Sequence, residues 1–205
     1  MYAPMIEYMS EADAVFIDIL YTEPSSYGEE DDIIFAEAVK KASNVYLALF
    51  LTNKKRALSD KDREFIERIA IKDKISHGLT FSSAVTPIDI LKASAKGSGA
   101  VTIPPDQDGV YRKVPLIFQM GEYRVPHFIL DYLLKKGSVS VRDGNLFSGN
   151  DRIPLHNDKL TLRYFRDMNP FAVLSAADIL KSYADIQDLK EPLIKKDYFK
   201  GKKVF

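Results

Sequence analysis

The residues of this sequence with the clearest chemical interest are carboxylates that accompany a predicted buried strand. Asp18 belongs to a nearly continuous apolar run, and Glu23 and Asp31 follow in the next segment. A carboxylate among apolar strand residues is costly unless it is paired or hydrogen-bonded. Two interpretations stay open: a polar site of these three residues for a cation or a basic ligand, and a structural ion pair of Asp18 with Arg112 or Arg166, which we favour.

A second group of candidate residues is basic. Arg112 and Lys113 follow an Asp-Gly turn, and Arg163 and Arg166 end a later predicted strand. Arginine binds carboxylates through a bidentate fork, so these side chains would suit an anionic ligand. Scattered basic residues are more often solvated surface, and both interpretations stay open.

Familiar catalytic and metal-binding patterns are missing. The sequence has no cysteine and no Gly-x-Ser-x-Gly motif. His77, His127 and His156 lie far apart, and each is expected on the surface. The glycine-rich stretch 96–100 is interpreted as a helix stop, because a phosphate loop would precede a helix. The turn 106–109 lacks the ligand spacing of a calcium loop. We therefore expect no catalytic residue, no metal and no cofactor.

Charge and hydropathy narrow the function further. The 205 residues carry 29 basic and 29 acidic side chains, so the formal net charge is zero and no basic excess indicates nucleic-acid binding. No apolar run reaches the length of about 20 residues that spans a bilayer. Both ends of the sequence fall within segments of predicted structure. We therefore expect an excised part of a longer protein, with any membrane segments outside it.

The first half of the chain predicts alternating strands and helices. Residues 14–20 and 45–51 are apolar runs typical of strands covered on both faces, and a helix begins after Gly28 between them. Its apolar residues at i, i+4 and i+8 spacing are expected to face inward: Ile34, Phe35, Ala38, Val39 and Ala42. Two strands joined by such a helix predict a βαβ unit with parallel strands.

The rest of the chain combines helix starts with short strands. Helices are predicted to begin near Ser59, at Thr86 and at Ser175. Turn-rich connections after residue 100 predict antiparallel hairpins. The predicted fold is α/β in a single domain over residues 1–205: a mixed β-sheet with a parallel N-terminal βαβ part and antiparallel C-terminal hairpins, and helices packed on the sheet faces.

Five motifs lie in a characteristic order along the chain. Residues 16–25 read hydrophobic-Asp-Ile-Leu-Tyr-x-Glu-Pro-Ser, and residues 105–116 contain Asp-x-Asp-Gly-Val-x-Arg-x-Val-Pro-Leu. Residues 31–44, 153–180 and 201–205 hold the other three motifs. In this order they resemble the blocks of the type-two CHASE domain, a cyclase/histidine-kinase-associated sensory extracellular domain.

The resemblance implies a ligand-sensing domain outside the cytoplasmic membrane of a bacterium. Asp18, Glu23, Asp108 and Arg112 occupy signature positions of that family, which makes them ligand-binding candidates. No catalytic residue carries over from the family. Residues 54–83 do not align with it.

The resemblance also implies a longer receptor. Flanking transmembrane helices would anchor it, and the domain would act as a homodimer on a cytoplasmic output module. That module would be an adenylate or guanylate cyclase, a histidine or Ser/Thr kinase, a phosphatase or a diguanylate cyclase. An unknown small-molecule ligand would bias the conformational equilibrium of the domain.

Two alternatives to a ligand sensor remain. One is a structural dimerisation or protein-interaction module without a small-molecule ligand. A concave pocket lined by Asp18, Glu23 or Arg112 would favour the sensor, and a flat apolar face would favour this module. The other alternative is a hydrolase, which would need a histidine clustered with a serine or a carboxylate.

Overall fold

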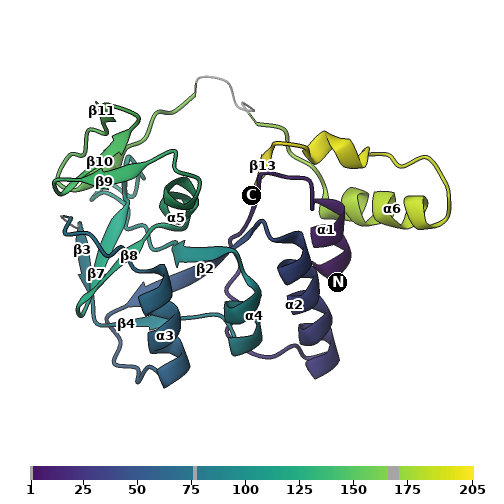
Figure 1. Cartoon of the computed structure of the whole chain (residues 1–205), viewed down its shortest axis with the longest axis horizontal. Coiled ribbons are helices and arrows are strands. Elements are labelled where there is room, and N and C mark those ends of the chain that lie inside the picture. The colour runs from purple at the N-terminus through teal and green to yellow at the C-terminus, as the bar shows by residue number, and fades with distance from the viewer. Residues whose placement is uncertain (1, 76–77, 166–170) are drawn as a thin grey trace.

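The computed structural model describes residues 2–75, 78–165 and 171–205, which contain a mainly parallel central sheet (Figure 1). Its parallel strands, in spatial order, are β13 (Lys203–Val204), β1 (Ala14–Ile17), β2 (Val45–Thr52) and β5 (Gly97–Ala100). β4 (Ser83–Val85) pairs antiparallel with the end of β2. The predicted βαβ unit is confirmed, because α2 (Glu29–Ala42) connects the parallel strands β1 and β2.

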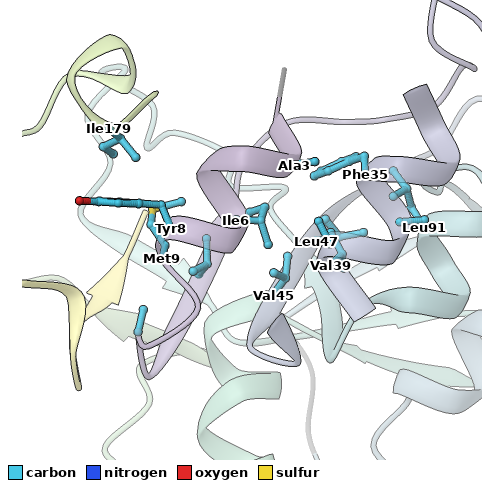
Figure 2. Close-up of a cluster of buried hydrophobic side chains, with 14 of the residues drawn as sticks. Ala3, Ile6, Tyr8, Met9, Phe35, Val39, Val45, Leu47, Leu91 and Ile179 are labelled. Carbon is cyan, nitrogen blue, oxygen red and sulfur yellow. The ribbon is translucent and has the colours of Figure 1, made fainter. Parts of the chain in front are cut away.

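Helices cover both faces of this sheet. Successive side chains of a strand point to opposite faces, so the apolar residues of β1 and β2 contribute to a core on each side. On one face, Val15, Val45 and Leu47 share a core with α1 (Tyr2–Tyr8), α2 and α4 (Asp89–Ser94) (Figure 2). On the other face, Phe16 and Tyr46 pack with α5 (Phe128–Lys135). The prediction that β1 and β2 are covered on both faces is confirmed.

Two glycines of β5 allow α5 to approach the sheet closely. A Cβ atom at Gly97 would lie 2.1 Å from Oδ2 of Asp131, and one at Gly99 would lie 2.5 Å from the backbone nitrogen of Phe128. Neither position has room for a side chain unless its neighbours move. The interpretation of this stretch as a helix stop is therefore wrong: α4 ends at Ser94, and the glycines belong to a strand.

A second packed region adjoins the end of β2. β3 (Leu79–Phe81), β7 (Ile117–Met120) and β8 (Tyr123–Pro126) form a sheet that α3 (Asp60–Ile69) covers with Phe65 and Ile66. Ser59 caps α3 in a capping box with Asp62, as its predicted helix start requires. Of the predicted antiparallel hairpins, β7 and β8 pair around Gly121, and β9 (Ser140–Arg142), β10 (Asn145–Ser148) and β11 (Asp151–Arg152) form short ladders. The hairpin predicted around the turn 104–109 is wrong, because β5 pairs with β2, and β6 (Lys113–Pro115) pairs with the distant β12 (Lys159–Thr161).

The C-terminal segment returns to the first helix and the first strand. α6 (Ala176–Gln187) begins at its predicted cap Ser175 and packs against α1, and the 3-10 helix η1 (Lys196–Phe199) precedes β13 (Figure 1). Figure 2 shows α1 between Ile179 of α6 and Val45 of β2. Among the described residues, no helix combines the length and the apolar character needed to cross a bilayer.

Two further local predictions are wrong. Phe35, Ala38 and Val39 of α2 are buried as expected, but Ile34 is half exposed, because it falls outside the face that these residues bury. α4 begins after Ile88 instead of Thr86. The Thr86 hydroxyl instead donates a hydrogen bond to Asp62 of α3, and so binds the segment that precedes α4 to α3.

Candidate functional site

The carboxylates expected beside the first strand lie in solvent. β1 ends at Ile17, so Asp18 falls in the following loop, and both Asp18 and Glu23 are exposed. The prediction of a buried Asp18 is wrong, because the apolar run continues beyond the strand and its last residue, Leu20, is itself 40% exposed. Asp18 forms no ion pair within the part of the chain that the structure describes, and the proposed partner Arg166 lies outside that part.

The acidic pair at the start of α2 binds the loop that precedes this helix. The Ser25 hydroxyl donates a hydrogen bond to Asp31 at 2.7 Å, and the Ser25 backbone N–H donates to Asp32 at 3.0 Å. The N-terminus of a helix also favours negative charge. Asp31 therefore has a local structural role, and its role in ligand binding stays a prediction.

The signature turn around Asp108 is closed by its own ion pair. Arg112 donates to both carboxylate oxygens of Asp108, at 2.9 and 2.8 Å, and this contact lowers the pKa of Asp108 to about 2. Gly109 takes a positive φ of 81°, as expected for a turn. The guanidinium fork is therefore occupied within its own loop, and the ligand-binding roles of Asp108 and Arg112 stay predictions.

A cavity of about 310 Å³ lies where α1, α2, α6 and η1 meet. We call it the α1–α6 pocket and define it by five of its polar lining residues: Glu7, Lys41, Tyr183, Gln187 and Lys196. The first two come from the N-terminal helices and the last three from the C-terminal segment. The pocket thus lies between parts of the chain that are far apart in sequence, and none of the candidates from the sequence lines it.

The charges of the α1–α6 pocket are only partly paired. The Tyr183 hydroxyl donates to Oε2 of Glu7 at 2.9 Å, and this contact raises the pKa of Tyr183. The Tyr8 hydroxyl donates to the carbonyl oxygen of Ile194, which fixes the ring in the wall. Lys41 and Lys196 form no ion pair or side-chain hydrogen bond with another described residue. Two ammonium groups and most of the hydrogen-bonding capacity of one carboxylate are therefore available to a ligand.

A second hollow, the α3–α4 groove, has the opposite character. Its volume is about 410 Å³, and Lys61, Asp89 and Lys92 are among its lining residues. Nζ of the buried Lys92 lies 2.7 Å from a carboxylate oxygen of Asp62 and 2.7 Å from one of Asp89. Lys61 also pairs with Asp89, at 3.0 Å, and Arg68 donates to the carbonyl oxygen of Lys92. Both lysines of this groove are therefore paired with carboxylates, and the pair of Lys92 with Asp62 holds α4 against α3.

The elements around the α1–α6 pocket continue into the last strand. β13 follows η1 within a few residues and pairs with β1, so that Lys203 lies beside Ala14. Nζ of Lys203 lies 3.5 Å from Asp13, and Asp13 also accepts hydrogen bonds from Lys136, which follows α5, and from Tyr132 of this helix; these two contacts lower its pKa to about 2. The pocket wall at η1 is thus connected by a few residues to the edge strand of the central sheet.

Sequence reasoning missed this pocket because its residues carry no local signal. Glu7, Lys41 and Lys196 have the patterns of ordinary exposed helix residues, and only the fold brings them together. It also missed a buried histidine: His127, expected on the surface, caps α5 by accepting a hydrogen bond from the Ile129 N–H, and burial lowers its pKa to about 4. His156 is exposed as predicted, and His77 lies outside the described residues.

Among the described residues, no three His, Asp or Glu side chains form a metal-binding group.

The family of the chain follows from a comparison with known proteins. Searches of curated proteins and of solved structures found no match. A family match to the CHASE2 domain covers residues 1–205, the whole chain, in agreement with the resemblance of its motifs. CHASE2 is a family of sensory extracellular domains in signalling receptors, not a catalytic one. The chain belongs to the CHASE2 domain family.

Proposed function

We propose that this chain is the extracytoplasmic ligand-sensing domain of a bacterial transmembrane signalling receptor, and that the α1–α6 pocket is its sensor site. One observation carries the placement: the pocket is lined jointly by α1 and α2 and by the C-terminal elements α6 and η1 that precede β13. Family membership supports the sensory role. A volume of about 310 Å³ supports a small-molecule ligand, since such pockets begin at about 300 Å³.

The proposed mechanism is a ligand-biased equilibrium between two positions of the C-terminal segment. A ligand that contacts both α1 and η1 stabilises the arrangement in which both line the pocket. It shifts the equilibrium only by its differential affinity for the two arrangements. Because only a few residues connect η1 to β13, the shift changes the docking of this strand on β1. In the receptor, this change would pass into a membrane helix that follows the domain.

The output of the receptor belongs to the same proposal. The domain would be anchored by flanking transmembrane helices and would control an adenylate or guanylate cyclase, a kinase or a diguanylate cyclase. It would work as a homodimer, because such output modules commonly work in pairs. The family's occurrence in signalling receptors supports this arrangement.

Thermal unfolding of the purified chain against a broad library of small metabolites tests the proposal. A sensor gains stability from a compound that binds the folded state, by RT ln(1 + [L]/Kd). We expect at least one compound to raise Tm, and Lys196→Gln to weaken this effect. If no compound in the library changes Tm, or if the effect is the same in Lys196→Gln, the proposed sensor site is wrong.

A dimerisation module without a small-molecule ligand is the second candidate function. It is favoured by four apolar side chains that are 39–50% exposed, two that follow β1 and two in the first turns of α2: Ile19, Leu20, Ile33 and Ile34. The test is the molecular mass by light scattering for the chain and for Ile34→Glu. A dimer that Ile34→Glu dissociates, together with a Tm that responds to no compound, would favour this candidate over the sensor.

A further inference from the structure

The α1–α6 pocket presents charges of both signs to its interior. Its acidic group is Glu7, and its basic groups are Lys41 and Lys196. On the basis of the sensor function proposed above, we infer that its ligand is a free α-amino acid, bound as a zwitterion. The ammonium group of the ligand would bind Glu7, and its carboxylate would bind one or both lysines.

The carboxylate of Glu7 suits an ammonium group. An ionised carboxylate only accepts hydrogen bonds and offers about four lone-pair sites on its two oxygens. The Tyr183 hydroxyl uses one of them, at Oε2. No other described side chain donates to Glu7. Tyr183 thereby orients the carboxylate, and the remaining sites can accept hydrogen bonds from an ammonium group.

The two lysines suit a carboxylate. Lys41 lies in the last turn of α2, and Lys196 begins η1, so they approach the cavity from different elements. Neither has an acidic partner within the described residues, whereas Lys92 in the α3–α4 groove has two. A carboxylate between Lys41 and Lys196 would bring the body of the domain and its C-terminal segment together. A neutral or purely cationic ligand would leave both ammonium groups unpaired.

The rest of the pocket wall suits a small or medium-sized apolar side chain on the ligand. Ala38 and Ala42 of α2 and Ile186 of α6 supply apolar surface between the charged groups. The cavity volume of about 310 Å³ lies at the lower end of the range for ligand pockets, which favours an amino acid over a nucleotide or a peptide. We expect apolar amino acids to bind better than acidic or basic ones.

The test compares amino acids with analogues that lack one of the two charges. Thermal unfolding is measured with each of the common L-amino acids, and then with 4-methylpentanoate and 3-methylbutylamine, which are leucine without its ammonium group and without its carboxylate. We expect at least one apolar amino acid to raise Tm, and both types of analogue to fail at the same concentration.

Substitutions of pocket residues test which side chain binds the ammonium group of the ligand and which binds its carboxylate. Glu7→Gln keeps an acceptor for Tyr183 but loses the negative charge, and Lys196→Gln loses one positive charge. Each is expected to weaken amino-acid binding about tenfold or more, since one charged hydrogen bond is lost. The matched controls Lys40→Gln and Lys195→Gln, which lie next to the pocket lysines in sequence, and Glu64→Gln, in the α3–α4 groove, are expected to leave affinity unchanged.

The outcomes separate the ligand class from the sensor function. If carboxylates without an ammonium group bind as well as amino acids, and Glu7→Gln has no effect, the zwitterion is wrong but the sensor site stands. If only compounds of another class raise Tm and do so through Lys196, the inference also fails and the sensor site stands. If no compound of any class binds, both the ligand class and the sensor function are wrong.

Discussion

The α1–α6 pocket and the α3–α4 groove are both hollows lined by lysine and acidic side chains, yet they use these residues differently. In the groove, Lys92 is buried between Asp62 and Asp89, and the exposed Lys61 also pairs with Asp89. In the pocket, Lys41 and Lys196 have no partner among the described residues. The comparison shows that the presence of charge does not mark a binding site, whereas charge left unpaired by the fold can.

The largest expected effect lies in the groove. Asp62→Ala removes one of the two carboxylates that pair with the buried Lys92, and with it the acceptor for the Ser59 N–H in the α3 capping box. Because Asp89 still pairs with Lys92, the loss of this pair and of the cap is expected to lower the free energy of unfolding by about 2 kcal/mol. Urea denaturation measures it. The surface control Lys61→Gln should cost less than about 0.5 kcal/mol, and an equal loss in the two variants would remove the distinction between buried and surface pairs.

The same pair predicts the pH dependence of stability. Burial raises the pKa of Asp62, but hydrogen bonds from Lys92, Thr86 and Ser59 outweigh it and hold this pKa below its usual value. The unfolded state therefore binds the proton first as pH falls, so the contribution of Asp62 is present above its ordinary pKa of about 3.8 and is lost below it. Asp62→Asn should unfold with a shallower loss of stability below pH 4 than the unsubstituted chain. Parallel curves would show that Asp62 titrates alike in both states.

The smallest effect on stability is expected in the pocket. Lys41→Gln and Lys196→Gln remove charges that have no partner among the described residues, so each should change the free energy of unfolding by less than about 0.5 kcal/mol. Urea denaturation again measures the change. A loss of 1 kcal/mol or more would show that these lysines stabilise the fold, as Lys92 does, and would erase the contrast between the two hollows.

Local signals explain which parts of the structure the sequence predicted. The parallel strands β1 and β2 and the helix caps at Ser59 and Ser175 follow from apolar runs and capping residues within a few positions. Asp18 was misplaced because an apolar run does not mark where hydrogen bonding to the next strand ends. The role of Gly97 could not be predicted, because the group that leaves no room for a side chain there, the carboxylate of Asp131 on α5, is distant in sequence.

The pocket itself was beyond prediction for the same reason. Glu7 and Tyr183 are joined by a hydrogen bond between segments 176 positions apart, and neither segment contains a sequence pattern that predicts contact with the other. Unpaired charge is a property of the folded chain, since it depends on which partners fail to come within reach. Only the arrangement of α1, α2, α6 and η1 distinguishes Lys196 from the many other exposed lysines.

Amide hydrogen exchange, measured with and without a saturating compound found in the Tm screen, shows which part of the domain responds to the ligand. We expect slower exchange in η1 and β13, because the ligand holds Lys196 and thereby the strand docked on β1. We expect unchanged exchange in α3, whose Asp62 is already paired with the buried Lys92. Protection confined to α3 and α4, or binding that leaves residues 196–204 unchanged, would contradict the claim that the α1–α6 pocket senses a ligand and that the C-terminal strand responds.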